Sequence, residues 1–124
     1  MILSGFRAEL AAIAGALVVE RAYPYPPDVT VAPAIFVDVV TMSAGATPGT
    51  ATVEATIHVV TDAADHAAGP WLDDTAEALW LALLTAGMRP TALEVRSLEL
   101  DVDDTRDRRA GRTVTVHRTV RPCP

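Results

Sequence analysis

The alternation of apolar and polar side chains over residues 51–61 is the strongest constraint on the fold of this chain. The apolar positions are Val53, Ala55, Ile57 and Val59. The polar positions between them are Thr52, Glu54, Thr56 and His58. A period of two is typical of a β-strand, because successive side chains point to opposite faces of a sheet. The segment therefore predicts a strand with one buried face and one polar face.

Three further segments have the composition of strands. Residues 34–42 (AIFVDVVTM) are rich in β-branched residues and are apolar at both parities, which predicts a central strand. Residues 92–102 form a strand whose apolar face carries Leu98, Leu100 and Val102. Residues 112–120 form the last strand, with Val114 and Val116 on one face and Thr113, Thr115 and His117 on the other.

Residues that favour turns or extended chain mark the connections. Residues 43–50 (SAGATPGT) predict the turn between two strands, and residues 103–111 (DDTRDRRAG) predict a polar hairpin loop. Earlier in the chain, Pro24, Pro26 and Pro27 remove backbone donors and favour extended conformations. We therefore expect a stiff extended connector before the first strand.

The N-terminal segment has the spacing of an amphipathic helix. Its large apolar residues recur at steps of three and four, along one stripe: Leu3, Phe6, Leu10, Ile13 and Leu17. A targeting segment is the alternative, because residues 10–19 are mostly apolar. Only Arg7 supplies a basic charge before that stretch, and Glu9 interrupts its start. The stripe favours a helix that packs on the core.

A second helix is predicted from Pro70 to about Ala86. Helical spacing relates its main apolar residues: Leu72, Ala76, Leu79, Trp80 and Leu83. Pro70 suits the first turn of a helix, Gly87 suits the C-terminal cap, and Pro90 prevents the helix from resuming. The preceding residues 62–69 fit either a loop or an extra early turn.

The predicted elements follow one another in the order α-β-β-α-β-β. This order predicts an α+β fold in which two helices pack on an antiparallel sheet of four or more strands. Residues 1–124 contain no internal repeat and no second linker, so we expect a single domain.

Composition excludes several functional classes. Ten basic residues, all of them Arg, stand against 16 acidic residues and give a net charge of −6. We therefore expect no specific nucleic-acid binding, which needs a basic footprint. No run of about 18 apolar residues is present, so we expect no membrane interaction through a spanning helix. Cys123 is the single cysteine and cannot form an internal disulfide.

Motifs for chemistry are absent from the sequence. The histidines His58, His66 and His117 lack the short spacing of metal ligands. Counted as a calcium loop from Asp101, the acidic run places Arg106 where glycine is needed and Arg112 where a bidentate glutamate is needed. No nucleophile motif and no glycine-rich phosphate loop is present. We expect no catalytic residue, no cofactor and no metal site, and hence no enzyme.

Partner contact is the function that the remaining distinctive residues suggest. Four arginines form the one local basic cluster, beside the acidic run: Arg106, Arg108, Arg109 and Arg112. A charged hairpin of this kind is typical of an exposed loop and can meet phosphate or an acidic partner. On the second helix Trp80 fits the core, whereas Trp71 is a candidate surface anchor.

Four segments in this order resemble the tail terminator proteins of long-tailed bacteriophages, also described as minor tail or tail-completion proteins, particularly those of phages that infect actinobacteria. A short amphipathic helix precedes AYPYPPDVTVAPAIFV (residues 22–37), which resembles the family's connector into its first strand. TVEATIHVVT (residues 52–61) precedes a helix ending in LLTAGMRPTALEV (residues 83–95). RTVTVHRTVRPC (residues 112–123) is similar to the family's closing strand. The resemblance covers nearly the whole chain.

The resemblance implies a structural virion protein. Such a subunit forms a homo-oligomeric ring, of six copies, on the last ring of the tail tube, where it ends tube polymerisation and supports head-tail joining. Its partners would be further copies of itself, the major tail tube protein and the head-completion or connector proteins. It would act at the head-proximal end of the virion tail after assembly in the host cytoplasm. DNA would pass through the ring, and an acidic wall would repel it.

Two other functions are compatible with the sequence. A head-closure or tail-completion adaptor of the same junction shares the size, the acidity and the lack of chemistry, and differs only in its partner. A small cytoplasmic ligand-binding or enzyme domain would use a pocket between helix and sheet lined by Glu54, His58 and His117.

Overall fold

The computed structural model describes residues 2–17, 21–27, 33–61, 65–102 and 105–121, with the backbone alone described for residues 65–68, 99–102 and 105–107. Two helices and five strands follow one another along these residues. The helices are α1 (Ile2–Gly15) and α2 (Asp65–Thr85). The strands are β1 (Ala22–Tyr23), β2 (Ala34–Ala44), β3 (Ala51–Val60), β4 (Arg89–Val102) and β5 (Thr105–Val120).

The five strands form one mixed sheet in the order β1-β2-β3-β5-β4. β2 with β3, β3 with β5, and β4 with β5 are antiparallel. β1 runs parallel to β2, with Ala22 opposite Ile35 and Tyr23 opposite Phe36. The prediction of an α+β fold with two helices is therefore confirmed. The prediction of a wholly antiparallel sheet is wrong, because the extended connector itself supplies a short fifth strand.

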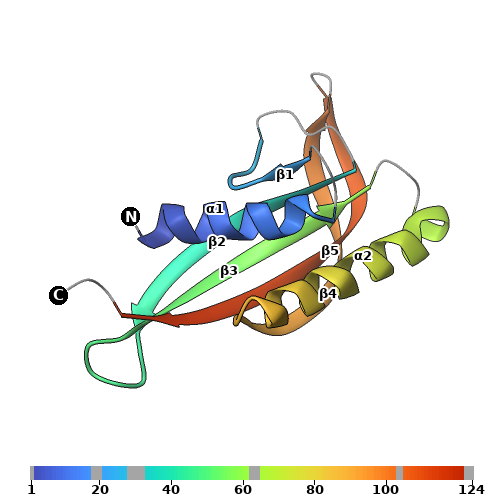
Figure 1. The fold of residues 1–124 in the computed structure, drawn as a ribbon. Helices are drawn as coiled ribbons and strands as arrows, with labels where there is room; N and C mark the ends of the chain where they lie inside the picture. Colours follow the sequence, from blue (N-terminus) through green and yellow to red (C-terminus); the bar gives the residue numbers. More distant parts are fainter. Residues whose placement is uncertain (1, 18–20, 28–32, 62–64, 103–104, 122–124) are drawn as a thin grey trace.

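Both helices cover the same face of the sheet, as Figure 1 shows. The buried side chains of both helices form one core cluster with the apolar side chains on that face of the strands. The buried members from the helices are Phe6, Leu10, Ala14, Leu72, Ala76, Leu79 and Leu83. Those from the sheet include Ile35, Val37, Val53, Ala55, Ile57, Val59, Val114 and Val116. The alternation that predicted a buried face and the stripe that predicted the first helix therefore meet in one core, except for Leu3, which is exposed.

The second helix begins earlier than the position of Pro70 suggests. α2 starts at Asp65, so Pro70 lies inside the helix and the extra early turn is correct. Proline at this position removes one backbone donor and leaves the helix otherwise continuous. The predicted C-terminal cap is confirmed: Gly87 has a φ of 80°, and the Met88 N–H donates to the Leu83 carbonyl over 3.0 Å.

The loop predicted for residues 103–111 is much shorter in the structure. β5 already begins at Thr105, and Val102 pairs with Thr105. β3 pairs with β5 only as far as Val60 opposite Gly111. Beyond that rung β4 and β5 pair only with each other and project from the sheet as a two-stranded arm (Figure 1). The register places Glu99 opposite Arg108, and residues of opposite charge favour strand pairing.

Within the described ranges, neither helix is long and apolar enough to cross a lipid bilayer.

Candidate functional site

The face of the sheet that the helices leave open carries the polar parity of the strands. Cross-strand pairs on this face join Thr52 to Thr119, Glu54 to His117, Thr56 to Thr115 and His58 to Thr113. The polar face predicted for residues 51–61 and 112–120 is thus assembled by the β3–β5 register.

At one end of this face, Asp38, His58 and Thr113 form a hydrogen-bonded chain. His58 Nε2 lies 2.9 Å from Asp38 Oδ2, and His58 Nδ1 lies 2.8 Å from Thr113 Oγ1. The ring of Phe36 packs edge-on against the imidazole, with 5.3 Å between the centroids. A register shift between Val37 and Val40 brings Asp38 into this position. The sequence placed His58 on the open face but contained no signal for its partners.

The order carboxylate, imidazole, hydroxyl is also that of a nucleophile triad. Thr113, however, is only 3% exposed, so its hydroxyl is out of reach of a substrate carbonyl. His58 is buried as well. These hydrogen bonds therefore satisfy the buried polar groups of His58 and Thr113, and they link β2, β3 and β5.

The ligand-binding alternative names Glu54, His58 and His117, and the structure brings two of them together. His117 Nε2 lies 3.2 Å from Glu54 Oε2 across the β3–β5 pair. His58 lies four residues along β3 from Glu54, and its hydrogen bonds go to Asp38 and Thr113 instead. All three lie on the open face, so no pocket between helix and sheet collects them.

The predicted arginine cluster divides in the structure. Arg108 is exposed and Arg109 is half-buried, while the side chain of Arg106 lies outside the described residues. Arg112 is 5% exposed, and its Nε donates to Asp73 Oδ1 of α2 over 2.8 Å. Arg112 shares the parity of Val114 and Val116, so it points toward the helices. The expectation that Arg112 is an exposed member of this cluster is therefore wrong.

Trp71 is 38% exposed on α2, as expected of a surface residue, and Trp80 packs partly against the core. The side chain of His66 and the whole of Cys123 lie outside the described residues.

An apolar surface that sequence reasoning missed lies where α2 meets β4. A groove of about 330 Å³ is lined by Glu77, Trp80, Leu81 and Leu93. Beside it Val95 is 70% exposed and Leu81 is 63% exposed. Val95 shares the buried parity of β4 with Leu93, which pairs with Val114. That parity was the available signal for an apolar side chain on this side of the sheet, where α2 leaves Val95 exposed.

β4 is also an edge strand, because it ends the strand order of the described sheet. One side of β4 pairs with β5 and the other has no strand partner among the described residues. Edge strands expose backbone donors and acceptors that can pair with another chain. The apolar groove and the unpaired edge together form what we call the β4 surface.

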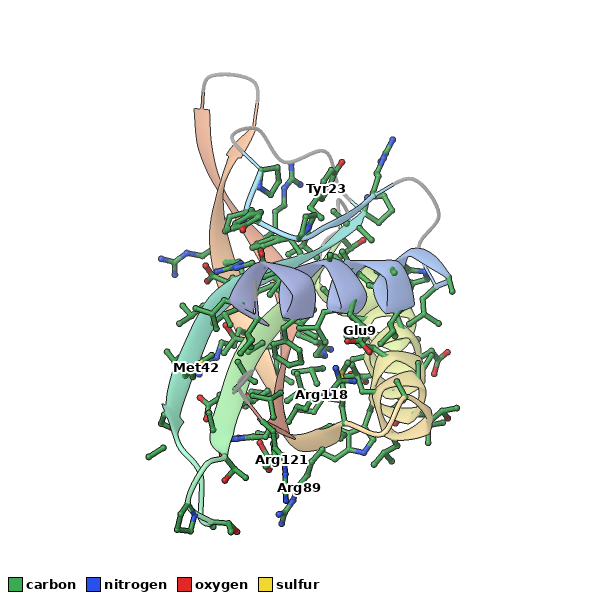
Figure 2. The ribbon with its side chains drawn as sticks, turned by 60° about the vertical axis from the view of Figure 1, so that its left-hand side comes forward. Glu9, Tyr23, Met42, Arg89, Arg118 and Arg121 are labelled. Atoms are coloured by element: carbon green, nitrogen blue, oxygen red, sulfur yellow. The ribbon has the colours of Figure 1, made fainter. Side chains whose placement is uncertain are left out.

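The opposite edge of the sheet is covered only in part. β1 pairs with Ile35 and Phe36 of β2, and no described strand pairs with the rest of that side. Val39 is 54% exposed, and Met42 is exposed as well. Figure 2 shows Met42 on the outermost long strand, on the side away from β4. This stretch, Val39 to Ala44, is called the β2 surface below.

Arg7 separates the covered part of β2 from the open part. Its guanidinium donates to the carbonyls of Pro24, Val37 and Asp38 over 2.9–3.3 Å. The same group stacks over the ring of Tyr25 at 4.4 Å. Arg7 thus fixes the connector and satisfies carbonyls at the bulge, so free pairing groups begin after Asp38.

A bidentate ion pair fastens α1 to the far end of β5. Arg118 donates to both carboxylate oxygens of Glu9 over 2.5 and 2.8 Å, and Figure 2 shows the two side chains facing each other. The hydrogen bond from Arg118 lowers the pKa of Glu9, and the same bond raises the pKa of Arg118. Both groups are therefore charged at neutral pH.

Among the described residues, no group of three or more His, Cys, Asp and Glu side chains gathers closely enough to hold a metal ion. No protein-family model matches the chain, and no curated protein matches it either.

Proposed function

We propose that this protein is a structural subunit that assembles through the edges of its sheet, and that it acts as a tail terminator of a long-tailed bacteriophage. In this role it forms a homo-oligomeric ring on the end of the tail tube, stops tube polymerisation and receives the head-completion proteins. The protein is then a component of the virion that assembles in the host cytoplasm. The observation that carries the proposal is the pair of opposite, apolar, unpaired sheet edges.

The geometry of the two edges favours a head-to-tail contact. The β4 surface and the β2 surface lie on opposite sides of the sheet: β4 ends the strand order, and on the other side β1 pairs with β2 only at Ile35 and Phe36. A strand of one copy can therefore extend the sheet of the next copy through backbone hydrogen bonds, with apolar side chains packing beside them. Contacts between two different surfaces propagate in one direction, and a suitable rotation closes them into a ring.

The terminator assignment within this class is supported by the resemblance of the sequence segments quoted above. The charge is compatible with it, because a chain of net charge −6 repels DNA that passes through a ring. An adaptor of the same junction would use the same kind of edges but would bind the portal side.

Light scattering after size-exclusion chromatography tests the assembly, with the protein alone and mixed with tail-tube subunits. We expect a species near six times the 13.1 kDa chain mass, alone or on the tube protein. A monomer at every concentration that also ignores tail tubes would overturn the terminator assignment. A ring that ignores tubes and binds portal-side proteins would assign the chain to the adaptors.

Charged substitutions on each edge test the head-to-tail contact. Val95→Asp should disable the β4 surface, and Met42→Asp should disable the β2 surface, so each variant alone should lose the ring. Mixed together, the two variants retain one competent surface each and should form a dimer. Leu3→Asp, at an exposed apolar position of α1, is the matched control and should keep the ring. Loss of assembly from Val95→Asp alone would instead indicate a symmetric β4-to-β4 contact.

A further inference from the structure

A pocket of about 620 Å³ lies at the end of the open face opposite the arm, where the turn between β2 and β3 comes close to the start of β4. Its walls come from that turn and from β3, β4 and β5. The lining residues that matter most are Thr47, Thr52, Arg89, His117 and Thr119. Figure 2 shows Arg89, Arg118 and Arg121 gathered at this end of the molecule.

The charge of the pocket is opposite to that of the protein. None of its lining residues is acidic, although the chain has 16 acidic and 10 basic residues. Arg118 and His117 are already paired, with Glu9 and Glu54 respectively. Arg89 is exposed and makes no ion pair or hydrogen bond with any residue that the structure describes. An uncompensated guanidinium therefore stands at the mouth of the pocket.

Hydroxyl groups supply further donors. Within the described part of the chain, the side chains of Thr47, Thr52 and Thr119 form no hydrogen bond. They come from the turn, from β3 and from β5, and so approach the pocket from different elements. A hydroxyl can rotate to donate to whichever acceptor enters.

The turn that forms one wall is held by its own hydrogen bonds. The Gly45 N–H donates to the Thr50 carbonyl over 2.9 Å, and the Thr50 N–H donates to the Thr47 carbonyl over 3.1 Å. A Cβ on Gly45 would come within 2.1 Å of Thr50 Oγ1, so the close packing of this turn requires glycine. The wall is therefore formed before any ligand binds, which lowers the entropic cost of binding.

We propose that this pocket binds a phosphate group, with Arg89 as the principal charge partner and the three threonine hydroxyls as additional donors. A tetrahedral phosphate has oxygens in several directions, which suits donors that come from separate elements. A planar carboxylate has only two oxygens and would leave some of these donors unused. Guanidinium groups also match phosphate oxygens with paired hydrogen bonds.

Heteronuclear NMR titration with inorganic phosphate, at constant ionic strength set by chloride, tests the site. We expect saturable shifts of the backbone amides of residues 45–52 and 117–119. Arg89→Ala should weaken binding by about tenfold or more, because it removes a charge-assisted contact. The affinity of Arg89→Lys for phosphate should lie between those of wild type and Arg89→Ala, because lysine keeps the charge but lacks the planar guanidinium. The absence of saturable shifts, or equal affinity for acetate, would overturn the proposal.

Arg96→Ala is the matched control, because Arg96 is an exposed arginine of the same strand that pairs with Glu94 outside the pocket. It should leave phosphate binding unchanged, and a loss of affinity equal to that of Arg89→Ala would overturn the site.

Titration with a nucleoside monophosphate identifies the source of the phosphate group. Tighter binding than inorganic phosphate assigns the pocket to a phosphorylated small molecule, and equal binding assigns it to the phosphate group alone. Both readouts are independent of ring formation, because Val95→Asp monomers can be titrated in the same way.

Discussion

The two faces of the sheet are built from the same strands and serve different purposes. The face under the helices packs Val53, Ile57 and Val116 into one continuous core. The open face carries threonines and the pairs Glu54–His117 and His58–Thr113. Because strand side chains alternate, a single register fills the covered face with apolar groups and the open face with polar groups. The main core is thus on one face, and most of the polar side chains are on the other.

Each face also contains an exception. On the covered face Arg112 is buried, where Asp73 of α2 pairs with it. On the open face Ala34, Phe36 and Val60 form a second small core that Tyr23 and Leu98 partly cover. Both exceptions arise where an element from elsewhere in the chain reaches the sheet. The following substitutions test how far the contrast between the faces extends.

The largest effect is expected on the covered face. Leu79→Ala removes a fully buried side chain from the core and should lower the free energy of unfolding by about 2–5 kcal/mol. Urea denaturation followed by circular dichroism measures the change. Leu84→Ala, at an exposed position of the same helix, serves as its control and should change stability by less than about 0.5 kcal/mol.

Gly111 tests the exception on the open face. A Cβ at this position would lie 2.8 Å from the Val59 carbonyl oxygen and 3.0 Å from Leu98 Cδ1. Gly111→Ala should therefore destabilise the protein by about 1–3 kcal/mol, as overpacking does. Thermal unfolding measures this change, and Gly5→Ala, where no atom lies within 4 Å of the added Cβ, is the control. A Gly111→Ala variant as stable as wild type would show that the backbone yields without cost.

The hydrogen-bonded chain of the open face predicts a smaller effect. Thr113→Val keeps the shape of the side chain but leaves Nδ1 of the buried His58 without its partner. We expect a loss of about 1–2 kcal/mol in chemical denaturation. Thr115→Val, on the same face of β5, should cost much less. If both variants lose the same free energy of unfolding, the hydrogen bond between Thr113 and His58 does not stabilise the sheet.

The smallest effect concerns the ion pair at the edge of the covered face, and it depends on pH. The pKa of Glu9 is lowered in the folded protein by its bond to Arg118, so the pair stabilises the fold above the pKa of the unfolded state. That contribution disappears as the pH falls through the folded pKa. Glu9→Gln should cost less than about 1 kcal/mol at pH 7, because the pair is largely exposed.

Measuring the unfolding free energy of wild type and Glu9→Gln from pH 7 to pH 3 tests this expectation. The difference between the two proteins should shrink toward zero on acidification. Glu77→Gln, which changes a glutamate with no ion pair among the described residues, should show no such convergence. A constant difference across this range would mean that Glu9 stabilises the fold through packing instead of charge.

Much of the fold is readable from the sequence, and less of the candidate site is. The stripe in α1, the alternation in β3 and the glycine cap of α2 reflect interactions between near neighbours in the chain. Sequence reasoning underestimated β5, because DDTRDRRAG has the polar composition of a loop, and it missed β1. β1 depends on pairing with the more distant β2, whereas the first residues of β5 pair with the neighbouring end of β4. The local composition of these segments reports neither pairing.

The sequence by itself determined the parity of each strand, the apolar faces of the helices and the end of α2, because these follow from steric and hydrogen-bonding preferences over a few residues. Only the tertiary structure decided that Asp38 and Thr113 bind His58, that Arg112 is buried against Asp73, and that Arg89 has no charge partner among the described residues. It also decided that Val95 and Met42 lie on opposite open edges. Each of these outcomes depends on which distant element reaches a residue, and loop closure and packing of the whole chain determine that.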